Sequence, residues 1–269
     1  MKKSISALSL YLIHFYCILL LLPSCSDLHC KEGNNEMTIQ SRQTDTMLES
    51  VCLNSDFTVF ISRSSKDSIS IESESNLIKD IITETINGKL VIKTADNACL
   101  NPRKPIIIRV FASNLKELEL NGSGSITSDT LISEALALNI SGSGNIRSAV
   151  KTQNLKVVMS GSGNLELWGK AGEARMDNSG SGSIESYGLD LDTCHTRLTG
   201  SGNVFTYVKE KLYASIAGSG SVYYKGKPEL EQNISGSGKV MNQLKRTLQS
   251  YSGRGSYNSS SPRSLYTIY

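Results

Sequence analysis

The tripeptide Gly-Ser-Gly recurs seven times between residues 122 and 238 of this 269-residue chain. The first glycines of successive copies are separated by 18 to 20 residues, and a fixed period in this range is typical of a solenoid. One further step reaches Gly253, where "SGRGSY" follows the same template and predicts an eighth coil. The predicted structural-turn glycines are Gly122, Gly124, Gly142, Gly144, Gly161, Gly163, Gly180, Gly182, Gly200, Gly202, Gly218, Gly220, Gly236 and Gly238.

Apolar residues on either side of the glycines recur at every second position. In "LNISGSGNI" the residues Leu138, Ile140, Gly142, Gly144 and Ile146 share one face, and the serines and asparagines share the other. A period of two indicates strands, and no helical period competes with it. Crossovers between parallel strands are right-handed. The sequence therefore predicts an all-β fold, a right-handed parallel β-solenoid (β-helix) of about eight 17–20-residue coils over residues 116–269.

The glycines and serines of the repeat have different predicted roles. The inward glycines are expected to lie where the backbone approaches the opposite wall of a flattened coil, or where a corner needs a bend or a positive φ. The outward serines are expected to form a ladder along the stack. Met176 and Cys194 fall in inward columns and are predicted to fill the core.

Residues 47–115 have strand character without the repeat. Asn87-Gly88 between "IITETI" and "KLVIKT" is a strong two-residue hairpin signal. We expect this segment to form an N-terminal β-rich cap that shields the open end of the solenoid.

The chain begins with an export signal, predicted to cover residues 1–24. A basic start precedes an apolar run and "LPSC", which resembles the lipobox of bacterial lipoproteins and predicts Cys25 as the lipidated residue. A retained transmembrane helix is the alternative. Residues 25–46 have few apolar residues and predict a flexible tether. The expected location is the outer membrane of the cell envelope, on its periplasmic or its exterior face.

Charge and cysteine spacing exclude several classes of partner. Without Lys2 and Lys3, 26 basic residues face 25 acidic ones, which argues against nucleic acid as a partner. No cysteine pair has the spacing of a zinc or redox site, so neither a metal nor another cofactor is predicted. Cys52 and Cys99 either form a disulfide in an oxidising compartment or remain buried thiols.

The chain resembles the head GIN domain family of bacterial auto-transporter adhesins, which is common in Bacteroidetes envelope lipoproteins. The resemblance rests on "FTVFISRSSKDSISIESE", "NGKLVIKT", "LKELELNGSGSI", the repeated "SGSGNI" and "SGSGNL", and "GKPELEQNISGSGKV", over roughly residues 47–243. It implies a secreted β-helical domain with an adhesive or structural role, and no catalytic residue can be carried over from the family.

An enzymatic reading has little support in the sequence. Asp190 and Asp192, with Glu185 and Glu173 in neighbouring coils, could bind calcium or act as a carboxylate pair, but acids in solvated turns are the favoured explanation. His195 is the one histidine inside the fold and is expected to point into solvent. Gly-Ser-Gly lacks the strand-to-helix context and the His–acid partner of a hydrolase nucleophile, and it does not open a helix as a phosphate loop must. A carbohydrate-active β-helix enzyme and a periplasmic structural or sensing protein remain alternatives.

Aromatic side chains at turns and outward positions favour binding. Their faces suit sugar rings or a protein partner, while covering the flank of the solenoid or mediating self-association into a homo-oligomer is the other interpretation. The sequence thus predicts a lipid-anchored, non-enzymatic adhesion or interaction module whose partners are the membrane and a glycan or protein. The candidate ligand-binding residues are Trp168, Tyr187, Phe205, Tyr207, Tyr223 and Tyr224.

Overall fold

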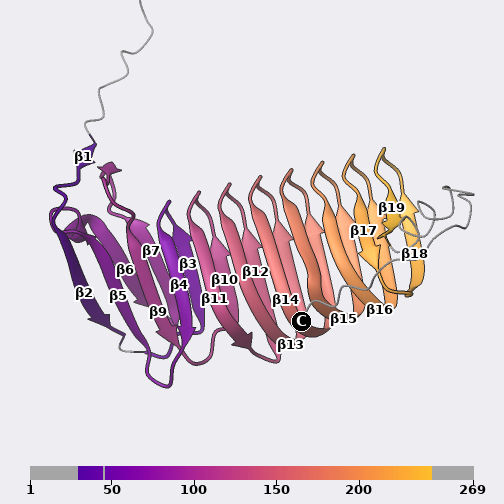
Figure 1. Cartoon of the computed structure of the whole chain (residues 1–269), viewed down its shortest axis with the longest axis horizontal. Coiled ribbons are helices and arrows are strands. Elements are labelled where there is room, and N and C mark those ends of the chain that lie inside the picture. The colour runs from indigo at the N-terminus through magenta and orange to yellow at the C-terminus, as the bar shows by residue number, and fades with distance from the viewer. Residues whose placement is uncertain (1–29, 45, 244–269) are drawn as a thin grey trace, which may run out of the picture.

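The computed structural model describes residues 30–44 and 46–243. The predicted signal segment 1–24, the lipidation residue Cys25 and the eighth coil around Gly253 lie outside these residues. Figure 1 shows an elongated stack of coils with a separate group of strands at its N-terminal end. No helix among the described residues is long and apolar enough to cross a membrane.

Strands make up almost all of the regular structure in the described part. The first nine are β1 (Lys31–Glu32), β2 (Met37–Gln43), β3 (Ser50–Asn54), β4 (Thr58–Arg63), β5 (Ser68–Glu74), β6 (Ile81–Ile86), β7 (Lys89–Thr94), β8 (Leu100–Asn101) and β9 (Ile107–Ala112), with the 3-10 turn η1 (Ile78–Asp80) before β6. The others are β10 (Glu117–Leu120), β11 (Ser125–Ile132), β12 (Ala135–Ile140), β13 (Asn145–Met159), β14 (Asn164–Asn178), β15 (Ser183–Leu198), β16 (Val204–Ile216), β17 (Val222–Lys225), β18 (Glu229–Ile234) and β19 (Val240–Asn242).

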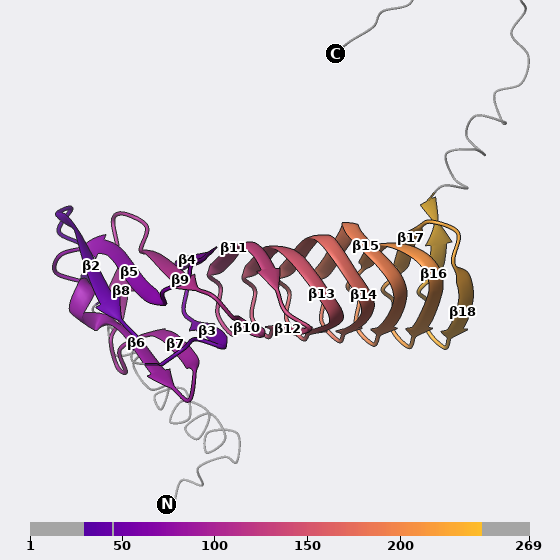
Figure 2. The ribbon, with the colours of Figure 1, turned by 90° about the horizontal axis from the view of Figure 1, so that it is seen from below.

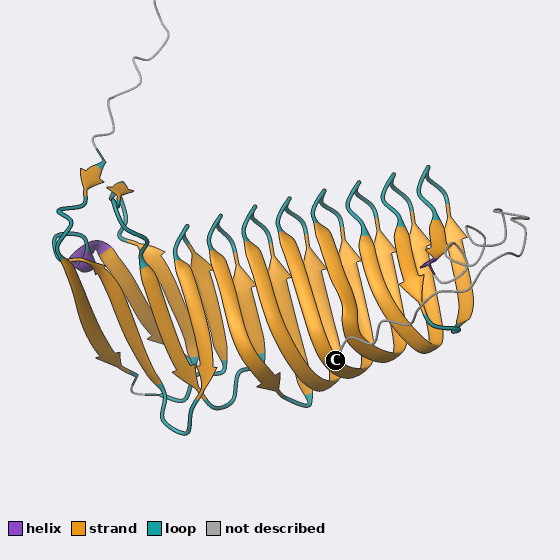
Figure 3. Cartoon of the chain, viewed as in Figure 1, coloured by secondary structure: helices purple, strands orange, loops and turns teal. Residues whose placement is uncertain are grey.

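The coils pair in parallel, which confirms the predicted β-solenoid, with about seven turns in the described part. Each coil contributes to two walls. The first wall follows each Gly-Ser-Gly and contains β4, β11, β17, β19 and the N-terminal halves of β13 to β16. The second wall precedes the next Gly-Ser-Gly and contains β3, β10, β12, β18 and the C-terminal halves of β13 to β16. The teal loops along one edge in Figure 3 are the Gly-Ser-Gly corners.

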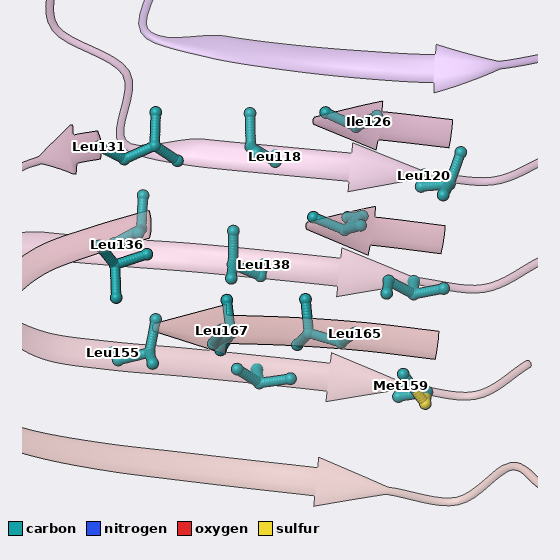
Figure 4. Packing of buried hydrophobic residues seen from close by; sticks show 14 of the residues in the cluster. Leu118, Leu120, Ile126, Leu131, Leu136, Leu138, Leu155, Met159, Leu165 and Leu167 are labelled. Carbon is teal, nitrogen blue, oxygen red and sulfur yellow. The ribbon is translucent and has the colours of Figure 1, made fainter. Parts of the chain in front are cut away.

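The core lies between the two walls and consists of the inward columns. Leu118 and Leu138 are fully buried and pair in register on successive coils (Figure 4), and the equally buried Val157 continues the column in the next coil. Burying an aliphatic side chain of this size stabilises a fold by roughly 1.5–3 kcal/mol. Met176 and Cys194 are also fully buried, as predicted.

The repeat glycines are required by the neighbouring coil. A Cβ on Gly142 would lie 2.0 Å from the carbonyl oxygen of Gly122, and one on Gly161 would lie 1.8 Å from that of Gly142. The Gly142 oxygen accepts hydrogen bonds from the N–H groups of Ser162 and Gly163 in the next coil. None of the fourteen glycines has a φ in the left-handed region. Of the expected causes, a close opposite wall and a positive φ were therefore wrong, whereas the bend at each corner and the outward, exposed position of the serines are confirmed.

The coil stack begins before the first Gly-Ser-Gly. Strands β3 and β4 pair in parallel with β10 and β11, so that Ser55 and Phe57 lie under Gly122 and Gly124. Ser55 and Phe57 can carry side chains because no tight corner stacks against them on the other side. There the neighbouring strands, β7 and β9, are joined by the longer segment 95–106. Part of the predicted cap is thus a solenoid coil.

The N-terminal end is closed by antiparallel strands. Strands β7 and β9 add in parallel to β3 and β4, and β6, β5 and β2 then pair antiparallel (Figure 2). Asn87 and Gly88 have φ values of 50° and 76°, as a two-residue turn of this hairpin type requires. The predicted hairpin is confirmed.

The segment predicted as a flexible tether is ordered over much of its length. Strand β2 pairs with β5 along seven residues, and Cys30 forms a disulfide with Cys99 beside the β1–β8 pair. The scarcity of apolar residues suggested a flexible segment because β2 is an edge strand made mostly of polar residues. A Cys52–Cys99 disulfide is excluded, since Cys52 is a buried free thiol.

The buried carboxylate of Glu74 holds the N-terminal segment with β1 and β2 in place. Glu74 has no exposed surface, and its two carboxylate oxygens accept hydrogen bonds from the N–H groups of Asn35 (2.6 Å) and Arg103 (2.9 Å). Burial alone would raise the pKa of Glu74. Backbone hydrogen bonds from Asn35, Arg103 and Lys104, with the charge of Arg103, outweigh it, and the pKa lies below its ordinary value.

Candidate functional site

Three of the predicted aromatic residues form one cluster on the first wall, here called the aromatic ladder: Tyr187, Phe205 and Tyr223. Strands β16 and β17 hold Phe205 and Tyr223 in register, and their rings stack 4.9 Å apart at 8°. Tyr187 meets Phe205 edge to face at 5.7 Å. All three side chains are half-buried, so part of each ring can contact a partner.

The ladder also carries a cation. The ammonium of Lys225 lies 4.2 Å from the centre of the Tyr187 ring, a cation–π distance. Burial, and then the charge of Tyr223, raise the pKa of Tyr187, so its hydroxyl stays protonated and can donate a hydrogen bond. The ladder therefore offers apolar ring surface beside polar groups.

The other three predicted aromatic residues do not join the ladder. Trp168 is 38% exposed and pairs with Ala149 and Gly188 near the far edge of the coils. Tyr207 is half-buried in register with Lys225. The prediction for Tyr224 is wrong: only 8% of it is exposed, because it stands two residues after the buried Val222 and shares its inward face.

The outer surface of the second wall carries a groove that sequence reasoning missed, here called the polar groove. It has a volume of about 430 Å³ and crosses β14, β15, β16 and β18. The rings of His195 and Tyr213 stack at its centre, 4.4 Å apart at 7°. Its main outward residues are Arg175, Asp177, His195, Arg197, Tyr213, Ser215, Glu231 and Asn233.

A signal for this groove was present in the repeat. Arg175, His195, Tyr213 and Glu231 each stand five residues before the first glycine of a copy, and the structure pairs them in one column. His195 was expected to be solvated. It instead stacks on Tyr213, and its Nε2 lies 3.4 Å from a carboxylate oxygen of Glu173.

Asp190 and Asp192, the carboxylates considered for an acid–base pair, do not form a free acid–base site. The ammonium of Lys209 lies 3.2 Å from Asp190 and 3.8 Å from Asp192, so both carboxylates share one cation. The hydrogen bond to Asp190 raises the pKa of Lys209. In the described residues, no group of three or more His, Cys, Asp or Glu side chains is placed to hold a metal ion.

The fold matches known structures. A protein from Bacteroides fragilis described as a putative adhesin is 20% identical with a TM-score of 0.75, and the alignment covers 79% of this chain and 99% of that one. A protein from Parabacteroides distasonis described as a putative lipid binding protein is 24% identical, with a TM-score of 0.66 and coverages of 79% and 98%. A protein from Parabacteroides merdae described as a putative adhesin is 22% identical, with a TM-score of 0.62 and the same coverages.

These identities support a shared fold. Among curated proteins no match is found. Residues 48–228 match the family model described as "Putative auto-transporter adhesin, head GIN domain", which covers the aromatic ladder and all of the polar groove except its β18 side. The chain therefore belongs to the head GIN domain family.

Proposed function

We propose that the protein is a lipid-anchored adhesion module of the cell envelope that binds a glycan or protein partner without altering it chemically. The aromatic ladder carries this proposal. Phe205 and Tyr223 keep partly open rings on a rigid wall in which strand pairing fixes their positions. Aromatic residues held in this way lose little conformational entropy on binding and dominate many interfaces.

Two further observations support an envelope location. The Cys30–Cys99 disulfide suits an oxidising compartment. The "LPSC" sequence before Cys30 supplies a lipid anchor on Cys25, which would hold the cap end of the solenoid near the membrane and leave the coils to project.

An adhesion assay tests the proposal. Cells that display the full chain are compared with cells that display the Phe205→Ser/Tyr223→Ser double variant, on immobilised host mucin and on epithelial cells. We expect at least tenfold fewer bound cells for the variant, because two aromatic contacts are lost. Phe60→Ser is the matched control, since Phe60 is 40% exposed on the same wall at the cap end. Equal adhesion by the double variant and the parent contradicts the proposal.

Location is tested separately. Protease treatment of intact cells should remove the protein from the surface, and Cys25→Ala should release it from the membrane fraction. A protein that stays protected until the outer membrane is opened is periplasmic and does not act in adhesion.

A further inference from the structure

The two arginines of the polar groove, unlike Arg109 and Arg147, have no acidic partner in the described part of the chain. Arg109 pairs with Glu72, and Arg147 pairs with Glu166 in the next coil at 2.7 Å. Among the described residues, neither Arg175 nor Arg197 forms an ion pair, although Asp177 is the direct neighbour of Arg197 in register. Their guanidinium groups are therefore available to a ligand.

The charges of the groove balance. Its two arginines, Arg175 and Arg197, are matched in number by two carboxylates, Asp177 and Glu231. Such a surface does not attract a polyanion over a distance. It presents fixed donors on the guanidinium groups and fixed acceptors on the carboxylates, and a hydroxyl group can use both kinds because it donates and accepts.

An aromatic surface stands between these polar groups. The stacked rings of His195 and Tyr213 belong to neighbouring coils, and the column continues to Arg175 on one side and Glu231 on the other. The groove crosses three coil steps, about 14 Å at the usual strand spacing. Its 430 Å³ lies within the usual range of ligand sites. These dimensions suit several linked rings rather than a single one.

We propose that the polar groove binds a neutral oligosaccharide. Arg175, Arg197 and Asp177 hydrogen-bond its hydroxyl groups, and the apolar face of one sugar ring packs on Tyr213. The inference rests on the proposed adhesive function and adds to it a second site of defined ligand chemistry, on the wall opposite the aromatic ladder.

The test is an array of neutral oligosaccharides that end in galactose, N-acetylglucosamine or mannose, together with their sialylated counterparts, probed with the full chain in detergent. We expect binding to at least one neutral glycan, with a Kd that changes less than threefold between 0.05 and 0.5 M NaCl. Tyr213→Ser and the Arg175→Gln/Arg197→Gln double variant should each weaken this binding at least tenfold. Tyr213→Phe should keep it within about threefold, because the ring remains.

Arg147→Gln is the matched control on the first wall, and each variant must keep the thermal unfolding midpoint of the parent. If Tyr213→Ser also lowers that midpoint, the arginine double variant decides the outcome. The proposal is overturned by binding to no neutral glycan, by preference for the sialylated forms, or by unchanged affinity in both groove variants. Loss of glycan binding in the Phe205→Ser/Tyr223→Ser variant alone would place the glycan on the ladder, leaving the adhesive function intact and refuting this site.

Discussion

Replacing Gly163 with alanine tests why the glycines recur. The new Cβ would lie 1.9 Å from the carbonyl oxygen of Gly144, whereas ordinary van der Waals contact begins at 3.4 Å, so the two coils must separate locally by about 1.5 Å. That shift breaks the hydrogen bonds from Asn164 N–H to Gly144 O and from Gly163 N–H to Gly142 O, each 3.3 Å long.

The expected cost follows from these contacts. Two lost hydrogen bonds cost about 2 kcal/mol, and local overpacking costs roughly 1–3 kcal/mol. The smaller entropy of the unfolded alanine chain returns about 0.4–1 kcal/mol. The free energy of unfolding should therefore fall by about 3 kcal/mol, which lowers Tm by roughly 6–12 °C in a domain of this size.

Thermal unfolding followed by circular dichroism measures this effect. Gly188→Ala is the matched glycine control, since the nearest atom to its Cβ would be Trp168 Cβ at 3.0 Å. Ser162→Ala tests the exposed residue of the same corner, and neither control should change stability by more than about 1 kcal/mol. If Gly163→Ala unfolds at the temperature of the parent, the clash between coils is not the reason for the repeat.

Three further predictions concern the cap and the thiols. Replacing both Cys30 and Cys99 by serine should lower stability by about 2–4 kcal/mol, because the disulfide closes a 69-residue separation, and limited proteolysis should then cut first in β1 and β2. Because the pKa of Glu74 lies below its ordinary value of 4.5, its ionised carboxylate stabilises the fold above pH 4.5, and this stabilisation is lost as the pH falls through the folded-state pKa. The Glu74→Gln variant should therefore be less stable than the parent in urea at pH 7 but should lose less stability on acidification. Burial raises the pKa of Cys52 to about 11 and that of Cys194 to about 12, so mass spectrometry should find neither thiol alkylated by iodoacetamide at pH 8 until the protein is unfolded.

The architecture could be predicted from the sequence because inward positions repeat. Leu138, Val157 and Met176 occupy one column, and strand periodicity converts that column directly into a core. The first coil, β3–β4, escaped prediction because Ser55 and Phe57 replace its glycines where no tight corner stacks beneath. The partner of Cys99 depended on β1, a two-residue strand with no periodicity to detect.

The candidate site was only partly predictable. Alignment of the coils on their glycines correctly predicted that Phe205 lies beside Tyr223, because equivalent positions on successive coils stack. Tyr224 was wrongly grouped with the aromatic residues at turns and outward positions, although its place in the alternation, two residues after Val222, pointed inward. The stacking of His195 on Tyr213 depends on side-chain geometry, and a histidine considered alone gives no indication of it.

The contact between successive Gly-Ser-Gly corners also makes the coils exchangeable. Each corner meets only the corners directly before and after it, and the same glycine-to-carbonyl contact recurs from Gly142 to Gly238. Removing residues 164–182 would bring Ser183 to the place of Asn164, its partner in register, without disturbing the cap or the last coils. The solenoid can therefore be shortened, or lengthened by duplication, in steps of about 4.8 Å, so natural variation can tune how far the last coils lie from the cap.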